Sequence, residues 1–253
     1  MFISLKKIFP TIILLAGSSC LFGQDVNEIM QHYFDTVSGG SINNWRKIKT
    51  AYVESTGYFN DPSLNVGSTH PPSMMESKTN YHRAFREWPD KLKTQIYEDS
   101  TYQILLSSNL WKDEKLVMKF RNGPPIIKQW PHVKWDFMPV VIHNLLKNSE
   151  EKKFIGIKNF EDDGITCFVI ELVTEGQTTN LYFNRNTYLL EYMKILNPSD
   201  SNNYTRYYDY KLIDGFLIHA SSYGTRNGVI TNAMKKTKIL FNIPIDQHVF
   251  EPD

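Results

Sequence analysis

The sequence predicts an α+β protein that is mostly β, with a curved antiparallel sheet or incomplete β-barrel and helices covering its concave face. Three observations support this class. The C-terminal half alternates β-type runs with Asp163-Gly164, Asp214-Gly215 and Asn227-Gly228, dipeptides that are typical of two-residue hairpin turns. No strand–helix–strand alternation occurs, which argues against a parallel sheet. Only two segments have helical periodicity, and a long antiparallel sheet must cover one face.

The first 23 residues have the three parts of a secretory signal. Lys6 and Lys7 precede an apolar run over residues 8 to 16, and small residues follow at positions 17 to 19. The apolar run is shorter than the roughly 20 residues of a membrane-spanning helix. We therefore expect residues 1 to 23 to be a signal peptide. Cys20 is either discarded with this leader or lipidated, although Gly17 stands where lipoprotein signals usually have leucine.

A helix is expected to open the mature chain. Its apolar residues recur at spacings of three and four, which places them on one helical face: Val26, Ile29, Met30, Tyr33 and Val37. Gly39-Gly40 ends this helix, because glycine adopts the left-handed conformation of a helix C-terminus without steric cost. Trp45 and Ile48 then lead into a first strand over residues 50 to 59.

Two irregular, proline-containing segments, over residues 60 to 80 and 121 to 135, interrupt the next part of the chain. Four short strands are expected between them, over residues 81–86, 92–98, 102–106 and 116–120. A second helix follows, which Asp136 is placed to cap and which has Pro139 in its first turn. The expected apolar stripe of this helix is Phe137, Val140, Val141, Asn144 and Leu145.

The C-terminal half predicts a seven-stranded antiparallel meander, over residues 153–160, 165–173, 178–184, 188–195, 204–213, 216–225 and 229–241. No linker-like segment divides the chain, so residues 24 to 253 are expected to form one domain. Alternation along the strand over residues 204 to 213 places Tyr204, Tyr208 and Tyr210 on one face and Tyr207 on the other.

Charge and cysteine content argue against several classes of function. The leader carries two of the 28 basic residues, so 26 basic residues remain against 27 acidic ones. This near-zero balance argues against the basic surface that a nucleic-acid binder needs. Cys167 is the one cysteine after the leader, which excludes an internal disulfide and a cysteine-rich zinc site. Hydrolase, nucleotide-binding and zinc-peptidase motifs are absent from the sequence, so we predict no enzyme activity and no cofactor.

Possible metal ligands have simpler explanations. Glu28 and His32 lie four residues apart on the first helix but lack a third ligand, and residues 161 to 163 form an acidic turn before Gly164. A zinc site at the irregular segments would require three histidines to converge: His70, His132 and His143. We therefore predict no metal site.

Large apolar residues in and beside the irregular segments are the candidate ligand-binding residues, because they could form the mouth of an apolar pocket: Met74, Met75, Trp130, Trp135, Phe137, Met138 and Val141. The alternative is that they complete the core. We also expect the loop over residues 60 to 80 to be a mobile flap at the opening of this pocket.

Both ends of the mature chain resemble a known family. Residues 26–33, Ser38-Gly39-Gly40 and residues 45–50 are similar to the start of outer-membrane lipoprotein-sorting-like envelope proteins with the LolA/LolB-like fold. The strand-to-Asp214-Gly215 step and the ending, which includes Phe250-Glu251-Pro252, resemble the family's recurring C-terminus. His219 departs from this pattern, which often has proline there. The resemblance implies a non-enzymatic carrier whose unclosed barrel holds the acyl chains of a lipoprotein or another lipid.

These observations favour a monomeric cell-envelope carrier or chaperone for a lipid or acylated lipoprotein, exported to the periplasm or outer membrane of a Gram-negative bacterium. Besides the acyl chains, an envelope protein is a possible partner, and no nucleic-acid partner is expected. Two alternatives remain open. One is an envelope binding or scaffolding module with a filled core, which would use the tyrosine-rich strand as a contact surface. The other is a hydrolase without a familiar motif.

Overall fold

The computed structural model describes residues 25–59, 80–89, 91–129, 137–160, 164–196, 203–226 and 229–252. Their helices are α1 (Val26–Ser38), α2 (Met138–Asn148) and the short 3-10 helices η1 (Ile42–Lys47) and η2 (Gln247–Phe250). None of the helices in these ranges is both long and apolar enough to cross a membrane. The strands are β1 (Thr50–Phe59), β2 (Asn80–Glu87), β3 (Lys91–Tyr97), β4 (Leu105–Lys112), β5 (Lys115–Phe120), β6 (Ile126–Gln129), β7 (Glu151–Phe160), β8 (Ile165–Thr174), β9 (Gln177–Asn184), β10 (Leu190–Leu196), β11 (Tyr204–Ile213), β12 (Phe216–Arg226) and β13 (Val229–Phe241).

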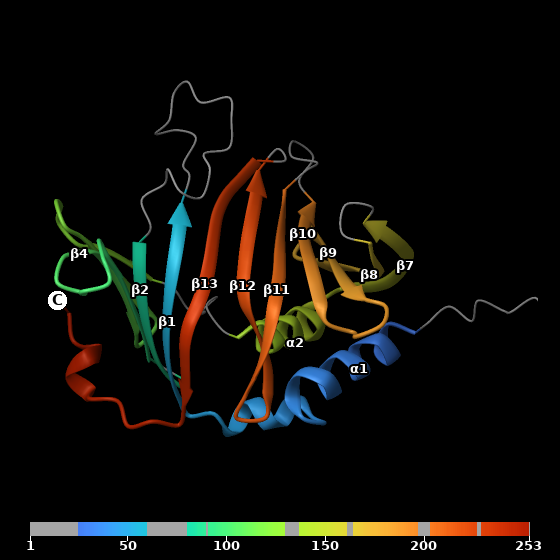
Figure 1. Ribbon diagram of the computed structural model, residues 1–253, viewed down its shortest axis with the longest axis horizontal. Helices are drawn as coiled ribbons and strands as arrows, with labels where there is room; N and C mark the ends of the chain where they lie inside the picture. The colour runs from blue at the N-terminus through green and yellow to red at the C-terminus, as the bar shows by residue number, and fades with distance from the viewer. Residues whose placement is uncertain are drawn as a thin grey trace, which may run out of the picture.

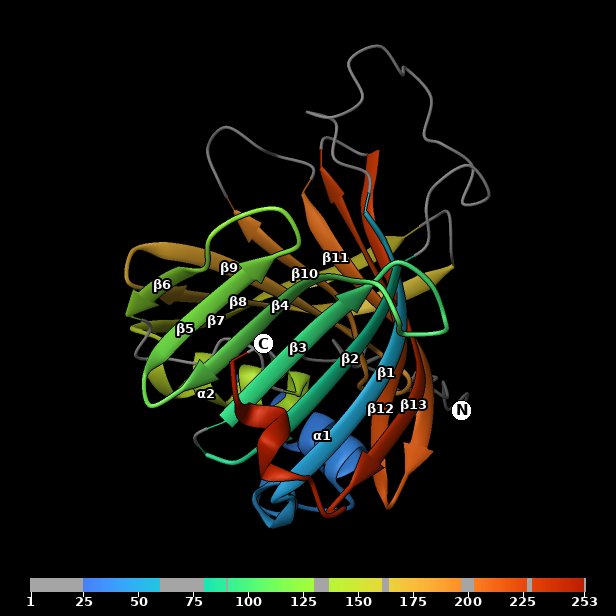
Figure 2. The same cartoon turned by 90° about the vertical axis from the view of Figure 1, so that its left-hand side faces the viewer.

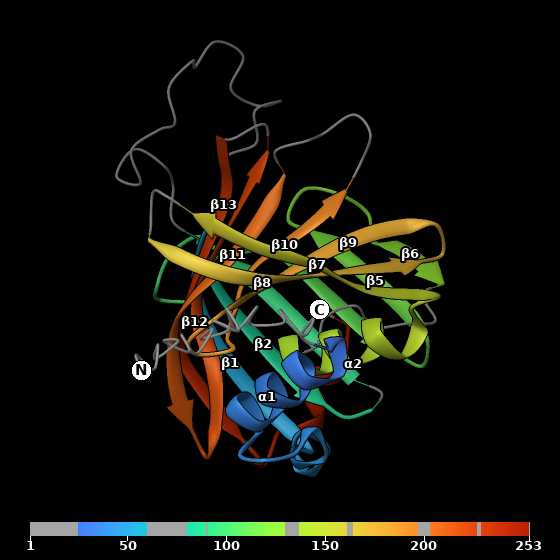
Figure 3. The same ribbon diagram turned by 90° about the vertical axis from the view of Figure 1, so that its right-hand side faces the viewer.

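The thirteen strands of the described ranges form one sheet, in the order β6-β5-β4-β3-β2-β1-β13-β12-β11-β10-β9-β8-β7. β1 pairs antiparallel with β13, from Ala51 opposite Phe241 to Phe59 opposite Asn232, so the first and last strands meet inside the sheet. Every other pair of neighbours is consecutive in the sequence. The sheet curves without closing, and α1 and α2 lie on its concave side (Figures 1, 2 and 3). The predicted fold class is confirmed.

α1 begins and ends where the sequence predicts. The Asp25 carboxylate accepts a hydrogen bond from the Asn27 N–H at 3.1 Å and caps the first turn. Gly39 follows the helix in the left-handed conformation, with φ 59°. The predicted apolar stripe faces the sheet, and Ile29 and Val37 are completely buried.

α2 forms where predicted, but its start and its buried face differ from the prediction. Phe137 is the N-cap residue and provides no side-chain cap. Asp136, to which we gave the capping role, lies outside the described residues. Asn144, which we placed on the apolar stripe, is exposed. The helix packs against the core through residues spaced by three and four that begin one position later than expected: Met138, Ile142, Leu145 and Leu146.

Two apolar clusters pack between the sheet and the helices. The first joins α1 and α2 to strands β8 to β11, and its buried members include Tyr33, Phe34, Ile142, Phe168, Ile170, Leu181, Phe183, Leu190 and Tyr207. The second lies between η1 and strands β1, β12 and β13, and it contains Trp45, Ile48, Ala51, Ile218, Ile239 and Phe241. Full burial of one large apolar side chain stabilises the fold by about 1.5–3 kcal/mol, so these clusters hold the helices on the concave face.

Two strands of the N-terminal half differ from the prediction. The strand expected over residues 102 to 106 is wrong: Tyr102 has φ 57° outside any strand, and β4 begins at Leu105. β6 lies within the segment expected to be irregular, two residues after Pro124. β6 pairs with β5, with Ile126 opposite Met118. The local sequence gives no sign of this pairing. The strands of the C-terminal half are confirmed, with shifts of one or two residues at several ends.

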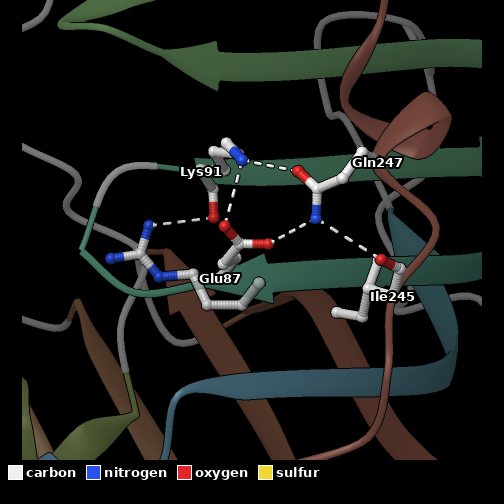
Figure 4. A network of polar contacts seen from close by, with 5 residues as sticks. Glu87, Lys91, Ile245 and Gln247 are labelled. Carbon is white, nitrogen blue, oxygen red and sulfur yellow. Dashed lines mark hydrogen bonds and ion pairs between the residues drawn. The ribbon is translucent and has the colours of Figure 1, made fainter.

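The C-terminal segment packs on the convex face of β2 and β3. Phe250 of η2 is 1% exposed, and Lys93 donates a hydrogen bond to the backbone carbonyl of Glu251 at 2.7 Å. Beside it, the Gln247 side chain donates to Glu87 at 2.8 Å and accepts from Lys91 at 2.6 Å (Figure 4). The closing residues on which the family resemblance rests therefore anchor the chain end to the sheet.

Candidate functional site

The register of β1 defines which side chains face the helices. Paired residues of an antiparallel ladder point to one face, and alternate residues of a strand point to opposite faces. Ala51 and Val53 pack in the second cluster around η1, so they lie on the concave face. Ser55 shares that face, as do its cross-strand partners His82 of β2 and Lys236 of β13.

Strands β3 to β6 form a wall with apolar side chains on the same concave face. The cross-strand pairs that lead outward from β2 place four apolar side chains on this face: Ile96, Met118, Phe120 and Ile126. These four residues belong to neither buried cluster, and Phe120 and Ile126 are 45% and 43% exposed. α1 and α2 pack on the other half of the sheet (Figures 2 and 3). Large apolar side chains gathered on a concave surface are typical of a ligand-binding surface.

Three of the predicted pocket residues come together at the start of α2, where the two clusters meet. The Phe137 ring centroid lies 5.3 Å from those of Trp45 and Phe241. Met138 packs against the first cluster, and Val141 is half-buried on the same turn of the helix. Their packing gives Phe137 and Met138 a core role, and a role in contacting ligand stays a prediction for all three. The remaining predicted residues lie outside the described ranges: Cys20, Met74, Met75, Trp130 and Trp135.

A half-buried lysine–histidine pair lies on the concave face between the two clusters. The Lys236 Nζ atom donates to the backbone carbonyl of His219 at 2.8 Å and lies 2.6 Å from His219 Nε2. The His219 ring packs against Tyr207 of the first cluster, with 4.9 Å between centroids. On the other side, the register places Lys236 one step along the concave face from Ile239 of the second cluster.

Burial sets the charge of this pair. Loss of hydration lowers the pKa of Lys236 from its ordinary 10.5 to about 7. Loss of hydration, and then the neighbouring Lys236, lower the pKa of His219 well below 6.5. No acidic side chain of the described ranges forms an ion pair with Lys236. At neutral pH the imidazole is therefore neutral, and the amine is close to half-protonated.

Sequence reasoning missed this pair because a bulge reverses the face of Lys236. Counting alternate residues back from Ile239 places Lys235 on the concave face and Lys236 on the convex one. The β1–β13 register shifts by one residue between Glu54 and Ser55, which leaves Thr237 as the extra residue. A sequence pattern does not locate such a shift, since it arises from pairing with a distant strand.

His82 extends the polar row on the concave face across β1. A Cβ atom built on Gly57 would lie 2.4 Å from His82 Nε2, so the imidazole occupies the space beside the glycine. Burial lowers the pKa of His82 from 6.5, which favours its neutral form at pH 7. The row of His82, Ser55, Lys236 and His219 thus crosses four adjacent strands, β2, β1, β13 and β12.

Other chemically reactive groups serve packing. Cys167 is fully buried, and burial raises the pKa of its thiol to about 12, which suppresses the reactive thiolate. His32 packs on Tyr188 with 4.5 Å between ring centroids, and His143 contacts the edge of Phe34. Among the residues with described positions, no three His, Cys, Asp or Glu side chains gather to hold a metal ion.

The tyrosines of strand β11 are divided between the two faces of the sheet differently from the prediction. Tyr204 and Tyr208 share the convex face, where both approach Tyr223 at 6.3 and 6.0 Å between centroids. Tyr210, which we placed with them, packs against the first cluster, and its hydroxyl donates to the Leu190 carbonyl at 2.6 Å. Asp209 has φ 56°, and this left-handed residue breaks the alternation between them.

Solved structures share this fold at low sequence identity. A DUF1329 family protein from Desulfovibrio piger has a TM-score of 0.58 at 12% identity, covering 89% of this chain and 97% of that one. A LolA superfamily protein from Nitrosomonas europaea has 0.55 at 11% identity, with the same coverages of 89% and 97%. A domain from Vibrio parahaemolyticus assigned to outer-membrane lipoprotein sorting has 0.52 at 10% identity, covering 80% and 89%.

No family model matches the sequence, and no curated protein matches it. The structural likeness confirms the LolA-like fold that the two ends of the chain resemble. At 10–12% identity this likeness concerns the fold alone.

Proposed function

We propose that the protein is a non-enzymatic carrier or chaperone of the cell envelope, which binds a lipid or the acyl chains of a lipoprotein on the concave face of its sheet. The observation that carries this proposal is the apolar wall of β3 to β6, which faces inward without joining either buried cluster. A LolA superfamily protein and a lipoprotein-sorting domain with the same fold support this class of cargo.

The energy of burying an acyl chain supports binding without a polar pocket. Each buried methylene contributes about 0.8 kcal/mol, so a chain of about 14 methylenes gains on the order of 10 kcal/mol. Immobilising a ligand costs about 4–15 kcal/mol. Because the two terms are of similar size, a polar contact at the head of the ligand decides between weak and tight binding.

The leader supports the proposed place of action. The signal-like residues 1 to 23 favour export, and a carrier of acyl chains is useful in the periplasm or at the outer membrane. We propose residues 24 to 253 as one monomeric carrier domain. The charge balance of the mature chain supports lipid rather than nucleic acid as the partner.

Lipid retention by matched variants tests the proposal. The protein is expressed with its own leader, purified from the cell envelope, and examined by native mass spectrometry and lipid extraction. Ile126→Asp places a charge on the concave face of β6, whereas Ile127→Asp changes the neighbouring residue on the convex face. Both isoleucines are exposed, at 43% and 66%, so neither variant disturbs a buried core.

We expect co-purified lipid with the wild type and with Ile127→Asp, and at least a tenfold loss of lipid with Ile126→Asp. The reason is that a carboxylate on the wall must be desolvated when an acyl chain covers it. A wild-type protein that carries no lipid and binds none on addition contradicts the proposal and favours a scaffolding module with a filled core. Equal retention by both variants contradicts the assignment to the concave face.

A further inference from the structure

Lys236 is a cation that folding alone does not require. Its amine is buried between two apolar clusters, and the described ranges supply no acidic partner for it. Taking an ammonium group out of water without a counter-charge carries a large desolvation penalty. An apolar side chain of similar length, such as methionine, would pack at this position without that cost. Ionisable groups held in such places are typical of binding and catalytic sites.

The hydrogen bonds of Lys236 leave one donor for a ligand. A protonated amine has three N–H groups. One bonds the His219 carbonyl at 2.8 Å and another faces His219 Nε2 at 2.6 Å. These two bonds fix the amine, and the third N–H has no acceptor among the described residues. The other buried cation of the concave face, Arg86, lies against the rings of Trp88 and Trp111, at 5.1 and 5.7 Å.

The pair lies within reach of the apolar wall. A single row of paired residues crosses the concave face from Lys236 through Ser55 and His82 to Ile96. Neighbouring strands are about 4.8 Å apart, so three steps separate Lys236 from Ile96 by about 14 Å along the sheet. A long acyl chain spans this distance. Met234, paired with Gly57, adds an adaptable apolar side chain beside the row.

We propose that Lys236, held by His219, binds the anionic head group of a single-chain acyl ligand whose tail lies on the wall of β3 to β6. The carboxylate of a long-chain fatty acid is the ligand class that fits best, because it carries one charge for one lysine and an acyl tail for the wall. A charge-assisted hydrogen bond to the amine then supplies the counter-charge that the protein lacks. This inference rests on the proposed carrier function and assigns the head-group site within it.

Fluorescent-probe displacement tests this inference by comparing the affinities for palmitate and for 1-hexadecanol. The two ligands have the same chain length, and only palmitate carries a charge. The variant is Lys236→Met, and the matched control is Lys235→Met on the convex face of the same strand, where Lys235 pairs with Thr56. We expect the wild type and Lys235→Met to bind palmitate at least tenfold more tightly than hexadecanol. In Lys236→Met this preference is lost, while hexadecanol affinity changes less than threefold.

The possible failures are separable. If the wild type binds neither ligand, the carrier function is wrong. If Lys236→Met keeps the tenfold preference for palmitate, the head-group site is wrong and the carrier function stands. If inorganic phosphate alone displaces palmitate from the wild type, the pair binds free anions and the lipid head-group assignment is overturned. Circular dichroism melts check folding, and should Lys236→Met not fold, Lys236→Gln takes its place in the same comparison.

Discussion

Three half-buried titratable side chains, His82, His219 and Lys236, line the middle of the concave face. The pKa of each is lowered, and the leading cause is the loss of hydration of the charged form. At neutral pH both imidazoles are uncharged, and Lys236, with a pKa of about 7, is close to half-protonated. The proposed acyl ligand would therefore meet polar but largely neutral groups, with one amine that becomes cationic when an anion approaches.

The lowered pKa of Lys236 predicts a pH-dependent difference in stability. A lysine of the unfolded chain titrates near 10.5, whereas Lys236 in the fold titrates near 7. Between these values the unfolded state binds a proton that the folded state does not, so the unfolding free energy rises with pH. Lys236→Met lacks this dependence. We expect its advantage over the wild type to shrink by about 1.4 kcal/mol per pH unit between about pH 7 and pH 9.

Urea unfolding of both proteins across this range measures the effect. His219 and His82 titrate below the window. Tyr33, Tyr207 and Tyr210 titrate above it, so these groups cancel in the comparison of the two proteins. Parallel pH profiles for the two proteins would show that Lys236 keeps an ordinary pKa.

The contact between Gly57 and His82 predicts that the loss of unfolding free energy caused by Gly57→Ala depends on the side chain at position 82. A methyl group at position 57 would lie 2.4 Å from the imidazole, so Gly57→Ala is expected to lose about 1–3 kcal/mol of unfolding free energy. In a His82→Ala background the space is vacant, and the same substitution should be nearly neutral. A double-mutant cycle by chemical unfolding measures the coupling. Equal losses in both backgrounds would contradict the close packing of this pair.

At the scale of the elements, strong local signals made much of the fold predictable. The Asp25 cap and Gly39 define α1, and Asp214-Gly215 forms the turn between β11 and β12. β4, with the polar sequence Ser-Ser-Asn in its middle, and β6 carry weak local signals, and both exist because neighbouring strands pair with them. The bulge at Thr237 and the left-handed Asp209 have no sequence signal that we recognised, yet each changes the face of a functional or core side chain.

The C-terminal segment is an element whose packing predicts a large effect. Phe250 is 1% exposed where η2 meets β3, so Phe250→Ala removes a buried ring and should lower the unfolding free energy by about 3–5 kcal/mol. His248→Ala, on the exposed side of the same turn, is expected to change it by less than about 0.5 kcal/mol. Thermal and urea unfolding compare the two. Similar small effects would mean that the segment is not anchored.

Because η2 lies on the convex face, folded Phe250→Ala protein should also bind palmitate as the wild type does. This measurement separates the stability of the sheet from ligand binding on its other face. A selective loss of palmitate binding in folded Phe250→Ala would place part of the ligand site on the convex side.

At the scale of the whole molecule, the pairing of β1 with β13 turns two meanders into one curved sheet. The sequence identified apolar residues in and beside the irregular segments, of which Phe137, Met138 and Val141 lie at the start of α2 near the junction of the clusters. It did not identify the wall or the lysine–histidine pair. These sites consist of residues from many strands, and the register that brings them to one face is a property of the assembled sheet.

The central claim is that an acyl chain lies on the concave face, and photo-crosslinking tests it most directly. The folded protein is loaded with a palmitate analogue that carries a photoreactive group near the end of its tail, and the labelled peptides are mapped by mass spectrometry. We predict adducts on the concave residues of β3 to β5, at Ile96, Met118 or Phe120. Adducts confined to the convex face, as at Ile127, would contradict the proposed site.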